Sequence, residues 1–205
     1  MRLSHSSLED CRRNPTRWAQ ANPIGQRPVR RIGYARIAKL AIYRYHKGTE
    51  RTRARAYLLQ ACQRNGLNNT GRIDAATATL DSYIDWAEQN DPVVADVMIR
   101  VELNLGSELL LGGEVSRVDV NRRGGYSAIL LDPPPEGWRE QLRMPLLQSA
   151  LARRYRRDER DIAVGFQDPD GGRPIVATYS GRDLLNAAEE ARTLAARVTA
   201  VWRRP

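Results

Sequence analysis

Cysteine, histidine and long apolar runs are scarce in this chain of 205 residues, and each scarcity excludes a class of protein. The two cysteines, Cys11 and Cys62, are too few for a zinc cage or a disulfide framework, so we expect ordinary buried or half-buried thiols. The two histidines, His5 and His46, have no partner at metal-ligand spacing, and we expect surface or capping roles for them.

Membrane and secretion signals are missing as well. No stretch approaches the roughly 18 apolar residues of a membrane span, and the first residues lack the apolar run of a signal peptide. We therefore expect a cytoplasmic protein without a membrane partner. The chain also contains no G-x-S-x-G, G-x-x-x-x-G-K-[ST] or G-x-G-x-x-G, so hydrolase, P-loop and dinucleotide-binding functions lack support. Gly112-Gly113 lies between two β-type runs, which predicts a turn or bulge.

Positive charge is what the chain has in excess. Its 33 Lys and Arg outnumber 24 Asp and Glu, and the net charge of +9 favours polyanions, with nucleic acid as the leading partner class. Residues 27–55 hold ten basic residues and one acid, Glu50, and account for the whole excess. We predict that these ten bind nucleic acid: Arg27, Arg30, Arg31, Arg36, Lys39, Arg44, Lys47, Arg51, Arg53 and Arg55. The alternative is a solvated basic surface without a ligand.

Tyrosines are interleaved with these cations at positions 34, 43, 45 and 57. Such an arrangement would suit stacking on unpaired bases. Tyrosines at helical spacing more commonly belong to a core, so both roles stay open.

The first part of the chain has helical periodicity. A short first helix is predicted from Ser6 or Ser7 to Arg13, and further helices over residues 32–45, 49–64 and 73–88. We therefore expect a basic, all-helical N-terminal region over residues 1–92, either a subdomain or integral to the fold.

After residue 92 the apolar pattern becomes β-type. Strands are predicted over residues 97–105, 109–120, 126–131, 162–166 and 174–179, with helices over 138–155 and 182–202, the last capped by Ser180 or Asp183. The core over residues 93–205 thus has the order β-β-β-α-β-β-α, which predicts an α+β fold of the three-layer α/β type, with a mixed sheet flanked by helices.

Four segments resemble the RecB-like branch of the PD-(D/E)XK nuclease superfamily. They are LSHSSLEDCRRNPTRW (3–18), LLLGGEVSRVDV (109–120), YSAILLDPPP (126–135) and QLRMPLLQSALARRY (141–155). The resemblance follows the element order of the whole chain and is closest over residues 113–155. It implies a PD-(D/E)XK nuclease-like core of a mixed sheet flanked by helices, preceded by a helical region.

The active site that this resemblance implies is degenerate. Members of the family hold a divalent cation between two carboxylates, and a lysine two residues after the second carboxylate serves the attacking water. Here Ser116 stands at the first carboxylate position, Asp132 at the second and Pro134 at the lysine. Gln141 matches the family's glutamine, and Asp119 its structural aspartate. We therefore predict no catalytic residue, no bound metal and no nuclease activity.

A rearranged site is the alternative to this prediction. Glu102, Glu114 or Asp119 could replace the missing ligand, and Glu102 fits best. Strand alternation predicts that Asp119 faces away from Ser116. If the site were active, the chain would be a Mg²⁺-dependent endonuclease or exonuclease. Asp132 could equally serve only to cap the proline-rich turn after its strand. The family's iron–sulfur cluster is not expected, because its cysteines are missing.

The function predicted from these features is that of an inactive, PD-(D/E)XK-like nucleic-acid-binding protein, a subunit or accessory factor in DNA or RNA processing or phage defence. A second hypothesis is a pseudo-nuclease that serves protein–protein interaction in an assembly with a helicase, a nuclease or a CRISPR-type complex. In that case the helical region or the last helix would be the docking surface, although we expect the apolar stripe of residues 187–202 to pack within its own domain.

Overall fold

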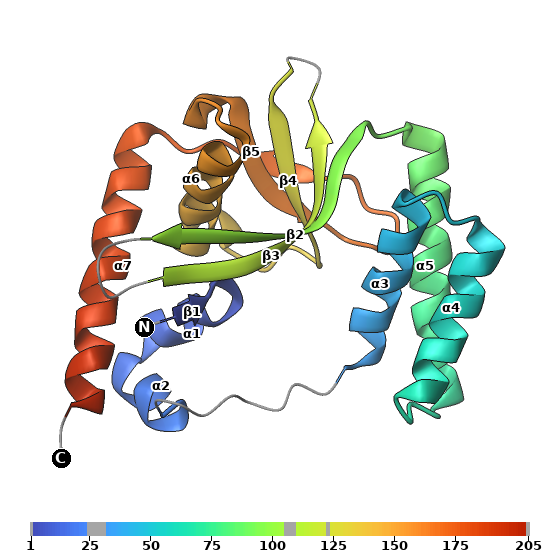
Figure 1. Ribbon diagram of the computed structural model, residues 1–205, viewed down its shortest axis with the longest axis horizontal. Helices are drawn as coiled ribbons and strands as arrows, with labels where there is room; N and C mark the ends of the chain where they lie inside the picture. Colours follow the sequence, from blue (N-terminus) through green and yellow to red (C-terminus); the bar gives the residue numbers. More distant parts are fainter. Residues whose placement is uncertain (1, 24–31, 105–109, 122–123, 204–205) are drawn as a thin grey trace.

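A computed structural model describes residues 2–23, 32–104, 110–121 and 124–203 of the chain (Figure 1). The elements in chain order are β1 (Arg2–Ser4), α1 (His5–Arg13), α2 (Pro15–Ala21), α3 (Tyr34–His46), α4 (Arg51–Arg64), α5 (Thr70–Asn90), β2 (Val94–Asn104), β3 (Leu110–Val120), β4 (Tyr126–Leu131), η1 (Trp138–Glu140), α6 (Arg143–Tyr155), η2 (Glu159–Asp161), β5 (Ile162–Gln167), β6 (Ile175–Ala177) and α7 (Gly181–Trp202). No helix in these ranges is long and apolar enough to cross a membrane.

The strands form one mixed sheet of six strands. β2 runs antiparallel to β3 along its whole length. The other edge of β3 is shared, with β1 parallel at its start and β4 antiparallel at its end. β5 lies parallel to β4, and β6 closes the sheet antiparallel to β5. The predicted α+β class, a mixed sheet flanked by helices, is confirmed.

Helices cover both faces of this sheet (Figure 1). One hydrophobic cluster joins α1, α2, α6 and α7 to the sheet, and a second joins α3, α4 and α5 to it. Alternation along β4 divides its side chains between the two, since Ala128 and Leu130 belong to the first cluster and Ile129 and Leu131 to the second. The chain is therefore built in three layers. The division of the chain into two domains at residue 92 stays a prediction. Helices α1 and α2, which precede that residue, pack in the first cluster together with α6 and α7.

Local sequence signals explain several element ends. The Ser4 side chain accepts a hydrogen bond from the Ser7 N–H at 3.2 Å and begins α1, so the predicted cap at Ser6 or Ser7 is wrong by two or three residues. Asn14 ends α1 and also caps α2, which Pro15 starts. Ser180 and Asp183 form a reciprocal capping box at the start of α7, as predicted.

The register of β2 and β3 shifts between Val94 and Asp96, and the backbone of β2 is irregular a second time at Met98. Met98 has a φ of 49°, in the left-handed region, and the registered pairs pass from Val97 with Arg117 to Ile99 with Val115. Met98 therefore lies across from Ser116. Gly112 and Gly113 pair regularly with β2, so the predicted turn or bulge at these glycines is wrong. The left-handed backbone of Met98 thus lies opposite the residue that occupies the first carboxylate position of the resemblance, whereas the register shift lies further toward the start of β2.

Candidate functional site

The end of β4 brings together the residues that the resemblance singled out. Asp132 directly follows the strand, and its carboxylate is exposed. The hydroxyl of Ser116, on β3, accepts a hydrogen bond from the Leu131 N–H at 3.1 Å. Pro134 lies exposed in the turn that follows. Ser116 therefore completes the hydrogen bonding of the strand end, where the resemblance implies a carboxylate.

Helix α3 supplies two cations to this region. Lys39 donates a hydrogen bond from Nζ to Oδ1 of Asp132 at 2.6 Å, and the Lys39 side chain is only 20% exposed. Arg36, one turn earlier, holds Glu114 of β3 through two hydrogen bonds, one of them 2.9 Å long. These bonds raise the pKa of Arg36 above its usual value. Both carboxylates are thus neutralised from the helical region.

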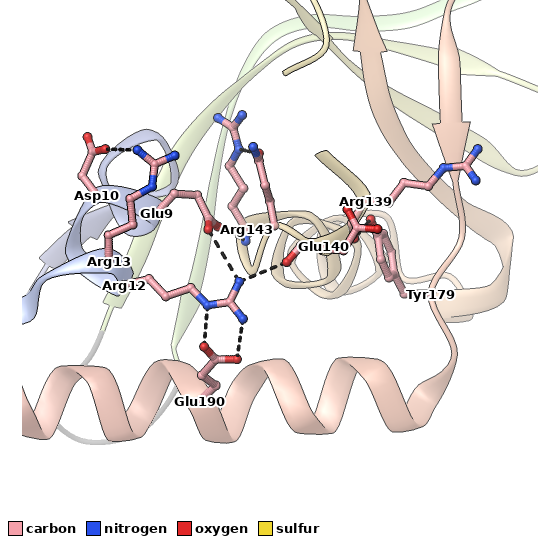
Figure 2. Close-up of polar contacts among 10 residues, drawn as sticks. Glu9, Asp10, Arg12, Arg13, Arg139, Glu140, Arg143, Tyr179 and Glu190 are labelled. Carbon is pink, nitrogen blue, oxygen red and sulfur yellow. Dashed lines mark hydrogen bonds and ion pairs between the residues drawn. The ribbon is translucent and has the colours of Figure 1, made fainter. Parts of the chain in front are cut away.

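A third cation approaches from the start of α6. The Arg143 guanidinium donates to Gln141 Oε1 at 2.7 Å and lies over the Phe166 ring at 5.2 Å. Its backbone N–H donates to Glu9 of α1 at 3.1 Å, and Figure 2 shows Arg143 beside Glu9. Burial lowers the pKa of Arg143, while the charges of Glu9 and Asp132 oppose that shift. Gln141 therefore orients Arg143.

Beside Glu9, α1 is fastened to α7 and η1 through Arg12 (Figure 2). The Arg12 guanidinium donates to both carboxylate oxygens of Glu190, at 2.5 and 3.1 Å, and to the Glu140 carbonyl at 3.0 Å. This bidentate contact fixes the helix that presents Glu9 to Arg143.

These residues do not fit a magnesium site. Mg²⁺ is bound by oxygen ligands, chiefly carboxylates that are not already paired with another cation. Glu114 and Asp132 already hold Arg36 and Lys39, and within the described ranges no group of three or more His, Cys, Asp or Glu is placed to hold a metal ion. Glu102 is exposed on β2, paired in the ladder with Gly112. A cation inserted next to Asp132 would have to displace Lys39.

A pocket of about 340 Å³ adjoins the Lys39–Asp132 pair, between α3, α5, the end of β4 and the turn after β5. Its wall is largely apolar, and its lining includes Ala38, Ala76, Leu131, Asp132, Asp168 and Asp170. Two cations, Lys39 and Arg72, line the pocket beside its three aspartates, and Lys39 is already paired with Asp132. The pocket therefore offers no surplus of positive charge to a nucleic-acid backbone.

Asp119 belongs to a different, buried network. Arg117 is fully buried and donates two hydrogen bonds of 2.7 Å to Asp119, as well as one to the Tyr83 hydroxyl. Burial raises the pKa of Asp119, and the Arg117 charge opposes that shift. Val115 and Val118 both point into the first hydrophobic cluster, so side chains do not alternate regularly through Ser116. The alternation argument that separated Asp119 from Ser116 therefore fails, but Arg117 engages Asp119 in any case.

His46 ends this network and is not the surface residue that we expected. Its Nε2 lies 2.7 Å from the Tyr83 hydroxyl, and the ring is half-buried at the end of α3. Since Arg117 donates to the Tyr83 oxygen, the hydroxyl proton is free to bond His46. Burial and the Arg117 charge lower the pKa of His46 to about 4. The two cysteines are fully buried, as predicted.

The predicted nucleic-acid-binding cations fall into three groups. Arg27, Arg30 and Arg31 lie outside the described residues. Four others hold acids within the chain: Arg36 holds Glu114, Lys39 holds Asp132, Arg51 holds Asp85 and Glu88, and Arg55 holds Asp81. The remaining three, Arg44, Lys47 and Arg53, have no ion pair with an acid of the described ranges.

The tyrosines among them are mostly core residues. Tyr34, Tyr45 and Tyr57 pack against the second hydrophobic cluster. Arg44 covers the Tyr57 ring at 4.0 Å, and Lys47 lies 5.9 Å from the Tyr43 ring. Of the two roles that the sequence left open, the structure favours packing over base stacking for these three packed tyrosines.

Sequence reasoning missed two residues of this site. Lys39 was assigned to nucleic-acid binding, yet it holds Asp132. Arg143 received no role, although it follows Gln141 by two residues. The three-residue spacing of Arg36 and Lys39 on one helix face was the available signal, but nothing in the sequence showed which acids that face would meet.

Comparison with known proteins found likeness only among solved structures. No family model and no curated protein matches the chain. The structure of the protein SSO0001 aligns over 91% of this chain and 85% of its own at 9% identity, with a TM-score of 0.32. A candidate exonuclease from Eubacterium rectale aligns over 98% of this chain and 80% of its own at 10% identity, with a TM-score of 0.52. The described chain therefore has a nuclease-like fold.

Proposed function

We propose that the chain is a nucleic-acid-binding protein of nuclease-like fold that has lost catalysis. The observation that carries this proposal is the contact of Lys39 with Asp132, because a lysine occupies the carboxylate that would otherwise receive a metal ion. Ser116 and Pro134 stand at the other two positions of the degenerate motif, and neither can hold a metal by charge or serve as a base at neutral pH. On this proposal the site is structural.

The binding part of the proposal rests on charge. A net charge of +9 attracts polyanions at long range, and phosphate contacts depend on where cations lie and not on a catalytic centre. Because four cations of the basic segment are neutralised inside the chain, we assign phosphate contacts first to Arg44, Lys47 and Arg53, together with Arg27, Arg30 and Arg31. A role as a subunit or accessory factor in nucleic-acid processing or phage defence extends this proposal.

One observation favours the rearranged, active site as a second candidate. Lys39 places an amine 2.6 Å from Asp132, where the resemblance requires a lysine beside a carboxylate. Catalysis would then need Mg²⁺ to displace or share this contact. The rival protein–protein module finds less support in α7, since Ala191, Leu194 and Val198 of that helix are buried in the first cluster.

The test combines binding and cleavage. Labelled single-stranded and double-stranded DNA and RNA are titrated with the protein at two salt concentrations, with and without Mg²⁺ or Mn²⁺, and each sample is then run on a denaturing gel. Binding that weakens steeply with salt and leaves every strand intact is the expected result. Metal-dependent cleavage that disappears in both Asp132→Ala and Lys39→Ala would replace this proposal with the active site. Absence of binding and cleavage would leave the protein–protein module.

A further inference from the structure

Helix α4 has two contrasting sides. Its buried side, formed by Ala54, Leu58, Ala61 and Cys62, packs mainly against α3 and α5, and Figure 1 shows the helix at the outer limit of the helical region. Its solvent side is polar or basic except for Ala56 and Leu59, and the helix contains no acid at all. The exposed polar residues are Thr52, Arg53, Arg55, Gln60, Gln63 and Arg64.

The arginines of α4 differ in whether they contact α5. Arg51 and Arg55 turn toward α5 and meet Asp85 and Asp81. Arg53 and Arg64 have no ion pair with an acid of the described residues, and the one hydrogen bond that Arg64 makes goes to the Gln60 carbonyl at 3.4 Å. The side of α4 that faces away from α5 is therefore free to meet an anionic partner.

Arg53, Gln60 and Arg64 lie on one line along this side. They are separated by seven and four residues, which an α-helix places within about 40° of one another. A rise of about 1.5 Å per residue puts the Cα atoms of the two arginines about 16 Å apart. The major groove of B-DNA is about 12 Å wide and accepts an α-helix. Arginines at this separation can reach the phosphates that border the groove, while Gln60 faces the base edges.

We propose that α4 binds in the major groove of duplex DNA, with Arg53 and Arg64 on the backbone and Gln60 and Gln63 toward the bases. This inference rests on the proposed nucleic-acid-binding function and names its ligand and its surface. Glutamine amides pair with adenine edges in that groove, and the exposed Leu59 and Ala56 are suited to contact with thymine methyl groups. Arg44 of α3 lies over the ring of Tyr57 of α4 and adds a further cation beside the line formed by Arg53, Gln60 and Arg64.

The structure favours this ligand over other nucleic acids. Binding of single strands relies on aromatic side chains that are exposed for stacking, whereas Tyr34, Tyr45 and Tyr57 are packed against the helical cluster. The major groove of double-stranded RNA is too deep and narrow to admit a helix. An acid-free helix at the outer limit of the helical region matches the B-form groove.

The test compares two double variants of equal charge. Arg53→Ala/Arg64→Ala removes the two cations of the line, and Arg182→Ala/Arg197→Ala removes two exposed arginines of α7, which lies far from α4 (Figure 1). Fluorescence anisotropy measures binding to a labelled DNA duplex of about 20 base pairs, to its separate strand and to the matching RNA duplex. Thermal melting followed by circular dichroism verifies that each variant is folded.

We expect the α4 variant to bind the DNA duplex about 10-fold more weakly and to lower the salt slope by about two, while the α7 variant changes affinity less than about 2-fold. Methylation of guanine N7, which lies in the major groove, should also weaken binding. Equal losses in the two variants, or undiminished binding to N7-methylated duplex, would overturn the proposal. Binding of single strands in preference to duplex would overturn it too but leave the proposed function standing, and no binding to any nucleic acid would remove both.

Discussion

Acidification should destabilise the protein through His46, and the buried network explains why. The neutral His46 ring is placed to accept the Tyr83 hydroxyl proton at 2.7 Å, while Arg117 donates to the same hydroxyl oxygen. A proton on His46 would remove the acceptor and place a second cation near the fully buried Arg117. The folded protein therefore resists protonation of this ring, and the pKa of His46 falls to about 4.

The sign and size of this pH effect on stability follow from the difference between the His46 pKa values of the folded and unfolded chain. The unfolded chain binds the His46 proton at its ordinary pKa of 6.5, and the folded protein binds it only near 4. The stability that the neutral ring contributes is thus present above pH 6.5 and is lost as the pH falls toward 4. Each unit of pKa difference corresponds to about 1.4 kcal/mol, so the neutral ring contributes about 3 kcal/mol to the free energy of unfolding in all. Lowering the pH from 7 to 5 removes about 2 kcal/mol of this contribution.

The assay is urea unfolding at pH 7 and pH 5 of the natural protein and of His46→Gln. The Gln variant keeps an acceptor oxygen for Tyr83 but has no proton to bind, and it carries the same carboxylates as background. We expect its stability to fall by about 2 kcal/mol less than that of the natural protein between the two pH values. Because the chain has only two histidines, NMR titration can follow the His46 ring directly. Parallel losses in both proteins, or a His46 pKa near 6.5, would refute this reasoning.

Three further substitutions test the packing that positions the site. Asp119→Asn should cost about 3–5 kcal/mol in urea unfolding, because it leaves Arg117 buried with its charge unpaired, and a loss under about 1 kcal/mol would contradict that account. Gly165→Ala should destabilise by about 1–3 kcal/mol and lower the melting temperature, because a Cβ there would come within 1.9 Å of the Ile175 carbonyl oxygen. Met98→Gly should be neutral or raise stability by up to about 1 kcal/mol, since glycine accepts the φ of 49° without strain, and clear destabilisation would show that the Met98 side chain outweighs its backbone strain.

Periodicity was sufficient to predict most of the fold. The apolar repeats located α3, α4 and α5 and all the longer strands, because these elements bury one side and expose the other. The three-residue β1 and the seven-residue α2 escaped prediction, since neither is long enough to show a period. α5 begins at Thr70, three residues before its first apolar position, because Asn69 caps it.

The candidate site was predictable only in part. Matching motifs located Ser116 within β3, Asp132 after the end of β4 and Gln141 just before α6, because each lies in a short local sequence pattern. The partners of these residues come from far along the chain, and no local pattern encodes them: Lys39 reaches Asp132 across 93 residues, and Arg36 reaches Glu114 across 78. The role of His46 was missed for the same reason, since its environment is set by Tyr83 and Arg117 from other elements.

Charge shows most clearly why sequence position is an incomplete guide to function here. Counted along the chain, the charged residues of the segment 27–55 are ten cations and one acid. In the fold, α5 turns Asp81, Asp85 and Glu88 toward α4, and the sheet turns Glu114 and Asp132 toward α3, so these acids neutralise cations from two sides. Exposed ion pairs of this kind add little stability. Their larger effect is on the described part of the basic segment, where only Arg44, Lys47 and Arg53 keep their charge without an acidic partner, so the proposed phosphate contacts are assigned to these three first.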